Sequence, residues 1–112
     1  MKMNGGASAD VTVGNMSAGG KTCVVIRADG DGSHVMSAGG ACRLLEVLYG
    51  CSEEAVVLCE RPLVLIHSLE YGSTYMLYRA VNGKPDGLIA VIRAHEAIWL
   101  KLKLEQAVSA CD

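Results

Sequence analysis

The sequence predicts an α+β domain in which helices pack on one five-stranded antiparallel sheet, in the order β-β-α-β-β-β-α. Three observations support this class. The chain has 112 residues, and 51% of them are hydrophobic, which suffices for one domain with one aliphatic core. Short apolar runs alternate with turns rich in glycine and aspartate. Longer segments repeat their apolar residues at the spacing of a helix.

The N-terminal segment, residues 1–21, is rich in Gly, Ala and Ser and has few apolar residues. Such a segment loses much conformational entropy on folding and buries little surface in return. We therefore expect a flexible Gly-rich tail at residues 1–21, followed by a single domain at residues 22–112.

The domain is expected to open with a β-hairpin. Residues 22–28 are apolar and β-branched, and Asp29-Gly30 follows them. Asp-Gly between two apolar runs is the strongest short signal for a hairpin turn. Residues 33–37 are predicted to form the returning strand.

A helix is predicted next, starting after Ser37, which can cap it, and ending before Pro62, which cannot continue it. The helical period is carried by Ala41, Leu44, Leu45, Leu48, Cys51, Ala55, Leu58 and Cys59. Gly50 interrupts this segment and weakens a helix. The alternative interpretation ends the helix near Gly50 and makes residues 55–60 a strand.

The second half of the chain predicts an antiparallel meander and a terminal helix. Residues 63–69, 74–81 and 88–94 are strand-like, and short turn-rich links join them. Residues 96–110 combine a strand-like alternation of leucine and charge with a helical apolar face. Their length without a turn residue favours the helix.

Composition and motifs argue against several functions. The net charge of −2 disfavours binding to nucleic-acid phosphates, and no apolar run is long enough to insert into a bilayer. The five cysteines are an odd number without a C-x-x-C pair, which indicates reduced thiols in the cytoplasm. The histidines lie far apart, at His34, His67 and His95. We expect no metal, no cofactor and no catalytic residues.

Several segments resemble Roadblock domains of the dynein-light-chain type. The resemblance covers residues 22–110 and is carried by residues 24–30, 75–81, 88–92 and 100–107. It implies a non-catalytic module that dimerises through its third strand and central helix. The dimer would bind or regulate a small Ras-like GTPase, or dock cargo on a motor.

The resemblance assigns the pairing strand to residues 63–69, although these residues also fit an interior strand. The implied interface residues are Leu45, Leu48, Val56, Cys59, Leu63, Leu65 and Ile66. The expected function is thus a cytoplasmic scaffold or regulator that binds another protein as a homodimer or heterodimer. The alternative is a β-grasp, ubiquitin-like interaction module, whose order also begins β-β-α-β.

Overall fold

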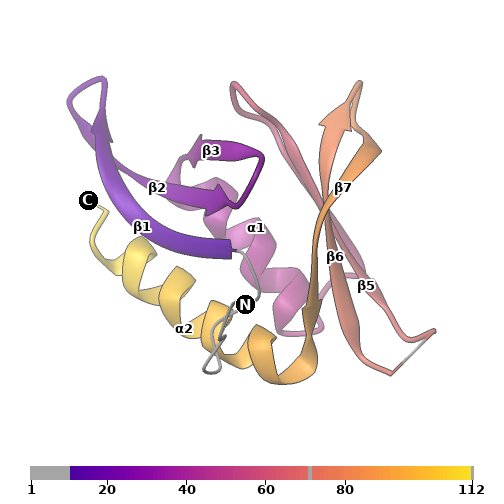
Figure 1. Ribbon diagram of the computed structural model, residues 1–112. Helices are drawn as coiled ribbons and strands as arrows, with labels where there is room; N and C mark the ends of the chain where they lie inside the picture. The colour runs from indigo at the N-terminus through magenta and orange to yellow at the C-terminus, as the bar shows by residue number, and fades with distance from the viewer. Residues whose placement is uncertain (1–10, 71, 112) are drawn as a thin grey trace.

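The computed structural model describes residues 11–70 and 72–111, and within them the chain forms two antiparallel sheets and two helices (Figure 1). Sheet A has the order β1-β2-β3 and sheet B the order β4-β5-β6-β7. The elements are β1 (Val11–Ala18), β2 (Lys21–Ala28), β3 (Gly32–Met36), α1 (Ala38–Leu48), β4 (Glu54–Val57), β5 (Leu63–Ser68), β6 (Thr74–Val81), β7 (Lys84–Arg93) and α2 (Ala94–Ser109).

The α+β class is confirmed, but the single five-stranded sheet is wrong. Two strands, β1 and β4, were not part of the predicted order, and each completes a separate sheet. The first predicted hairpin pairs with β1, while the predicted meander pairs with β4. The strands therefore divide between two sheets of three and four strands.

Strand β1 occupies part of the segment that was expected to be a flexible tail. It pairs with β2 along its whole length, from Val11 opposite Ala28 to Ala18 opposite Lys21. Gly19 and Gly20 form the connecting turn with φ values of +61° and +79°, which glycine adopts without strain. The glycines that suggested flexibility are thus the turn of a hairpin. Residues 1–10 of the expected tail lie outside the described residues.

The long central helix is also wrong, and the alternative with a break near Gly50 is correct. Helix α1 ends at Leu48, and Gly50 follows with φ of +82°. A residue in this conformation is a common helix terminator. At the other end the prediction is confirmed, since Ser37 Oγ accepts a hydrogen bond from the backbone N–H of Gly40 at 3.2 Å.

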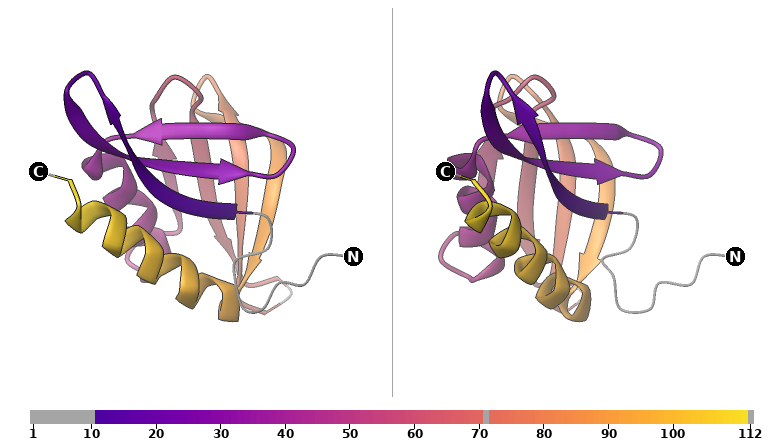
Figure 2. Two further views of the ribbon diagram at one scale, coloured as in Figure 1. Left: turned by 60° about the vertical axis from the view of Figure 1, so that its left-hand side comes forward. Right: turned by 90° about the vertical axis from the view of Figure 1, so that its left-hand side faces the viewer.

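The other expected elements are confirmed, except that β7 begins at Lys84, inside the link that was expected before residue 88. The hairpin of β2 and β3 turns at Asp29-Gly30, and β5, β6 and β7 form the antiparallel meander. The terminal segment is helix α2, which runs alongside α1 and β1 (Figure 2). No helix in the described part of the chain is long and apolar enough to cross a membrane.

The core lies between the two sheets and is completed by the helices. Its largest fully buried aliphatic side chains are Ile26, Leu44, Leu63, Leu65, Ile92 and Leu104. Both helices and sheet A lie on the same side of sheet B (Figure 1). This arrangement leaves the other face of sheet B without a covering element among the described residues.

Candidate functional site

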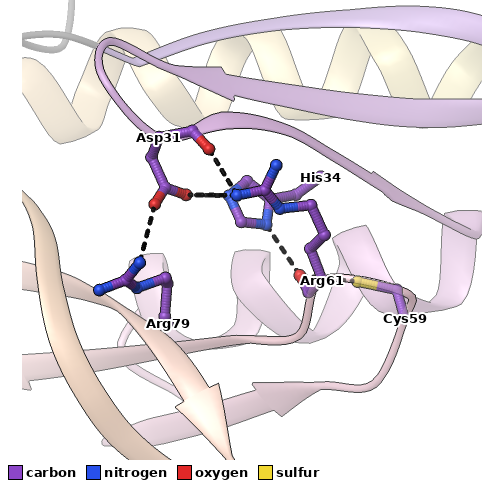
Figure 3. A network of polar contacts seen from close by, with 5 residues as sticks. All are labelled: Asp31, His34, Cys59, Arg61 and Arg79. Carbon is purple, nitrogen blue, oxygen red and sulfur yellow. Dashed lines mark hydrogen bonds and ion pairs between the residues drawn. The ribbon is translucent and has the colours of Figure 1, made fainter.

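A polar network joins the two sheets at the end of β3 (Figure 3). His34 on β3 is fully buried. Its Nδ1 lies 2.8 Å from the carbonyl oxygen of Arg61, in the loop between β4 and β5, and its Nε2 lies 2.6 Å from Oδ2 of Asp31. Asp31 belongs to the turn between β2 and β3. The imidazole therefore links the hairpin of sheet A to sheet B.

The partners of His34 fix the direction of its hydrogen bonds. A carbonyl oxygen only accepts, so Nδ1 carries a hydrogen and donates it to the Arg61 carbonyl. At 2.6 Å, Nε2 and the Asp31 carboxyl oxygen need one proton between them. The pair is thus either an imidazolium with a carboxylate or a neutral imidazole with a carboxylic acid. In both forms the buried ring is fully hydrogen-bonded.

Two arginines lie beside this pair. Arg61 Nη2 donates to the backbone carbonyl of Asp31 at 2.6 Å and lies 4.0 Å from Oδ2 of the same residue. Arg79 Nη1, on β6, lies 3.8 Å from Asp31 Oδ1. The Cys59 thiol donates to the Arg61 carbonyl at 3.3 Å, and burial raises its pKa. This thiol is therefore a weak nucleophile at neutral pH.

A cavity of about 340 Å³ opens next to the network and touches His34. Its charged lining comes from Arg61, Arg79 and Asp86. Its apolar lining comes from Pro62, Ala80 and Val81. The register of β6 and β7 shifts on either side of Tyr78, close to Asp86. Such irregularities redirect side chains and are frequent beside binding sites.

The outer face of sheet B is a second candidate site, because it carries two apolar rows across the strands. Directly paired residues point to the same face of a sheet. The first row is Val56, Val64, Tyr78 and Leu88, and the second is Ile66, Met76 and Val91. Leu88 and Val91 are 52% and 39% exposed, whereas Val64 is fully buried and the other four residues are half-buried. Apolar side chains gathered on one uncovered face are typical of a protein-interaction surface.

The residues expected at a dimer interface divide between the core and this face. Leu48, Leu63 and Leu65 are buried in the core of the chain, with Leu45 and Cys59 packed against it. Val56 and Ile66 are the two that belong to the apolar rows of the outer face.

The structure also leaves β5, the expected pairing strand, without an open edge. It pairs with β4 on one side and β6 on the other. The interior-strand interpretation of residues 63–69 is therefore correct.

From the sequence, His34 was expected to be a structural residue of a strand rather than a metal ligand or catalytic group, and Arg79 was not singled out. Strand alternation could have identified His34, because His34 and Met36 continue the buried phase of β3. Arg79 follows Tyr75 and Leu77 on β6 but is exposed, so alternation does not mark it. A polar residue in the buried phase of a strand needs a hydrogen-bonding partner, which marks it as part of a site.

Among residues 11–70 and 72–111, no group of three or more His, Cys, Asp or Glu residues could hold a metal ion. Comparison of the chain with protein-family models, with curated proteins and with solved structures gave no match. The function is therefore inferred from the geometry of the two candidate sites.

Proposed function

We propose that this protein is a non-catalytic protein-binding module that associates with a second copy of itself through the outer face of sheet B. The observation that supports this most strongly is the pair of apolar rows on that face. Burying apolar surface gives about 25 cal/mol for each Å² removed from water, so a second copy packed on this face would be stabilised.

Association through the face is favoured over pairing through the edges of sheet B. Strand β4 has only four residues, which limits the ladder that it could extend. Strand β7 contains Pro85, which lacks a backbone donor, and its register is irregular. Short, bulged and proline-containing edges discourage edge-to-edge pairing.

The charges around the face suit a two-fold arrangement. Glu54, on β4, is paired with Ile66 and so lies at one end of the second apolar row. Arg93, on β7 at the opposite edge, lies one row further along the strands. A two-fold axis parallel to the strands would bring Glu54 of each copy close to Arg93 of the other. Opposite charges at these positions fix the register of an isologous contact.

The small GTPase or motor partner that the Roadblock resemblance implies depends on a five-stranded sheet, which the described residues do not form. We therefore limit the proposed partner to a second copy of this chain.

The native mass in solution tests this function. Size-exclusion chromatography with light scattering should give twice the chain mass of 11.8 kDa. The double variant Leu88→Glu, Val91→Glu should give the monomer mass with nearly unchanged thermal stability, because both side chains are already partly exposed. The matched control is Ile98→Glu on α2, a 66% exposed apolar residue outside the face, which should remain dimeric.

A wild-type chain that stays monomeric at about 100 μM would refute self-association, since this concentration detects even weak dimers. A dimer that survives the double variant would place the interface elsewhere.

A further inference from the structure

The cavity between the sheets contains charges of both signs, and the proposed dimer does not use it. Arg61 and Arg79 supply positive charge, and Asp86 supplies negative charge. The side chains of the two arginines are 49% and 56% exposed, so they are accessible to a ligand.

Two glycines allow the guanidinium groups to lie directly against the backbone. A Cβ atom at Gly32 would come within 2.7 Å of a guanidinium nitrogen of Arg61. At Gly87, a Cβ atom would come equally close to Arg79, at 2.7 Å. Both glycines have positive φ, +101° and +106°, which disfavours any other residue. The backbone thus makes room for both cationic groups at the cavity.

The arginines retain hydrogen-bond donors for a ligand. Arg79 approaches the Asp31 carboxyl group only at 3.8 Å, beyond a normal hydrogen bond, and Arg61 approaches it only at 4.0 Å. Arg61 uses Nη2 for the Asp31 backbone carbonyl. Each guanidinium has five N–H donors, so several remain to bind a carboxylate.

Asp86 determines which kind of ligand fits these cations. An inorganic dianion would gain from Arg61 and Arg79 but would be repelled by the carboxyl groups of Asp31 and Asp86. A ligand that carries one negative and one positive group can satisfy both signs at once. The apolar lining of Pro62, Ala80 and Val81 suits an aliphatic side chain.

From this combination we infer that the cavity binds a free aliphatic α-amino acid. The ligand's carboxylate pairs with Arg61 and Arg79, its ammonium group pairs with Asp86, and its side chain lies against the apolar lining. The volume of about 340 Å³ accommodates a molecule of this size.

Binding is tested on the full chain with three related probes. L-Leucine has both charged groups, isocaproate lacks the ammonium group, and isoamylamine lacks the carboxylate. In amide NMR titrations, L-leucine should produce saturable shifts at residues around the cavity, with a dissociation constant of about 1 mM. Isocaproate and isoamylamine should each bind at least about tenfold more weakly, because each loses one charged contact.

Variants assign the two ends of the ligand. Arg79→Gln should weaken L-leucine and isocaproate by about tenfold and leave isoamylamine unchanged. Asp86→Asn should weaken L-leucine and isoamylamine but not isocaproate. The matched control is Arg27→Gln, which changes an exposed arginine of β2 outside the cavity and should alter none of the three titrations. Thermal unfolding checks that each variant remains folded.

Three results would overturn this assignment. The first is no saturable shift with L-leucine at about 10 mM, ten times the expected dissociation constant. The second is isocaproate or inorganic phosphate binding as tightly as L-leucine, which would indicate a simple anion site. The third is L-leucine binding that Arg79→Gln and Asp86→Asn leave unchanged.

Discussion

The His34→Leu variant should lose about 3 kcal/mol of its free energy of unfolding. His34 is fully buried, and its ring bonds the Arg61 carbonyl in the loop before β5 and the Asp31 carboxyl group in the β2–β3 turn. Leucine fills a similar volume, so the cost of a cavity is small. The loss therefore comes from the polar partners that the substitution leaves behind.

The magnitude follows from what happens to each partner. The Arg61 carbonyl keeps a hydrogen bond from the Cys59 thiol, so its loss is small. Asp31 loses its short hydrogen bond to Nε2 while its side chain is only 12% exposed. Removing one partner costs about 1–3 kcal/mol for a buried neutral pair and about 3–5 kcal/mol for a buried charged pair. Arg61 and Arg79, at 4.0 and 3.8 Å, still offset part of that cost, which places the expected loss near the lower end.

Urea unfolding followed by circular dichroism measures this loss, and the melting temperature should fall by roughly 10–15 °C. Asp31→Asn is the matched control. The side-chain amide that this substitution introduces can donate to Nε2 of a neutral imidazole whose Nδ1–H still bonds the Arg61 carbonyl, so this variant should lose only about 1 kcal/mol. A loss below about 1 kcal/mol in His34→Leu, or equal losses in both variants, would refute the hydrogen-bond directions assigned here.

Two further predictions follow from β1 and from Cys59. Deleting residues 1–18 should lower the melting temperature by more than about 10 °C. The deletion removes the hydrogen-bond ladder to β2 and the buried Val11, whose burial contributes about 2 kcal/mol. An unchanged thermal transition would contradict the role of β1. Iodoacetamide at neutral pH should alkylate Cys59 several-fold more slowly than the exposed Cys51, because burial raises the Cys59 pKa and reduces its thiolate fraction. Mass spectrometry of quenched samples measures both rates, and equal rates would show that Cys59 is not protected.

The sequence predicted correctly those elements whose turn residues are compatible with only one local structure. Asp29-Gly30 between two apolar runs identified the β2–β3 hairpin, and the turn residues after β5 and β6 identified the meander. Gly19-Gly20 was harder, because the same residues suit a flexible tail and a tight turn. Only the pairing of β1 with β2 distinguishes the two, and that contact depends on the folded domain.

The central segment was wrongly predicted as one long helix for a related reason, because its residues fit two periods. Ala55, Val57 and Cys59 alternate as a strand does, but Ala55 and Cys59 also lie four residues apart, as on a helix. Gly50, with its positive φ, was the local residue that could decide between these interpretations. The strand was correct because β5 offers β4 a partner for its backbone groups.

The candidate sites could not be predicted, because each depends on how distant segments meet. The outer face of sheet B exists only because β4 pairs with β5. The predicted helix through residues 54–57 would not have placed Val56 on a sheet. The cavity requires Arg61 and Arg79 to meet a turn that lies thirty or more positions earlier in the chain. Sequence alone gives their charges but not their proximity.

The division into two sheets is what creates the cavity. In a single sheet, β3 would pair through its backbone with a strand of the meander, and no space would remain between them. Instead β3 ends sheet A, and side chains replace the missing ladder: His34 bonds the Arg61 carbonyl, and Arg61 bonds the Asp31 carbonyl. Hydrogen bonds made by side chains span a longer distance than backbone pairing, so the sheets can separate at this point. Every buried side-chain polar atom of the described residues still has a hydrogen-bond partner. The same residues therefore hold the sheets together and line the cavity, so a ligand bound between Arg79 and Asp86 should also stabilise the junction of the two sheets.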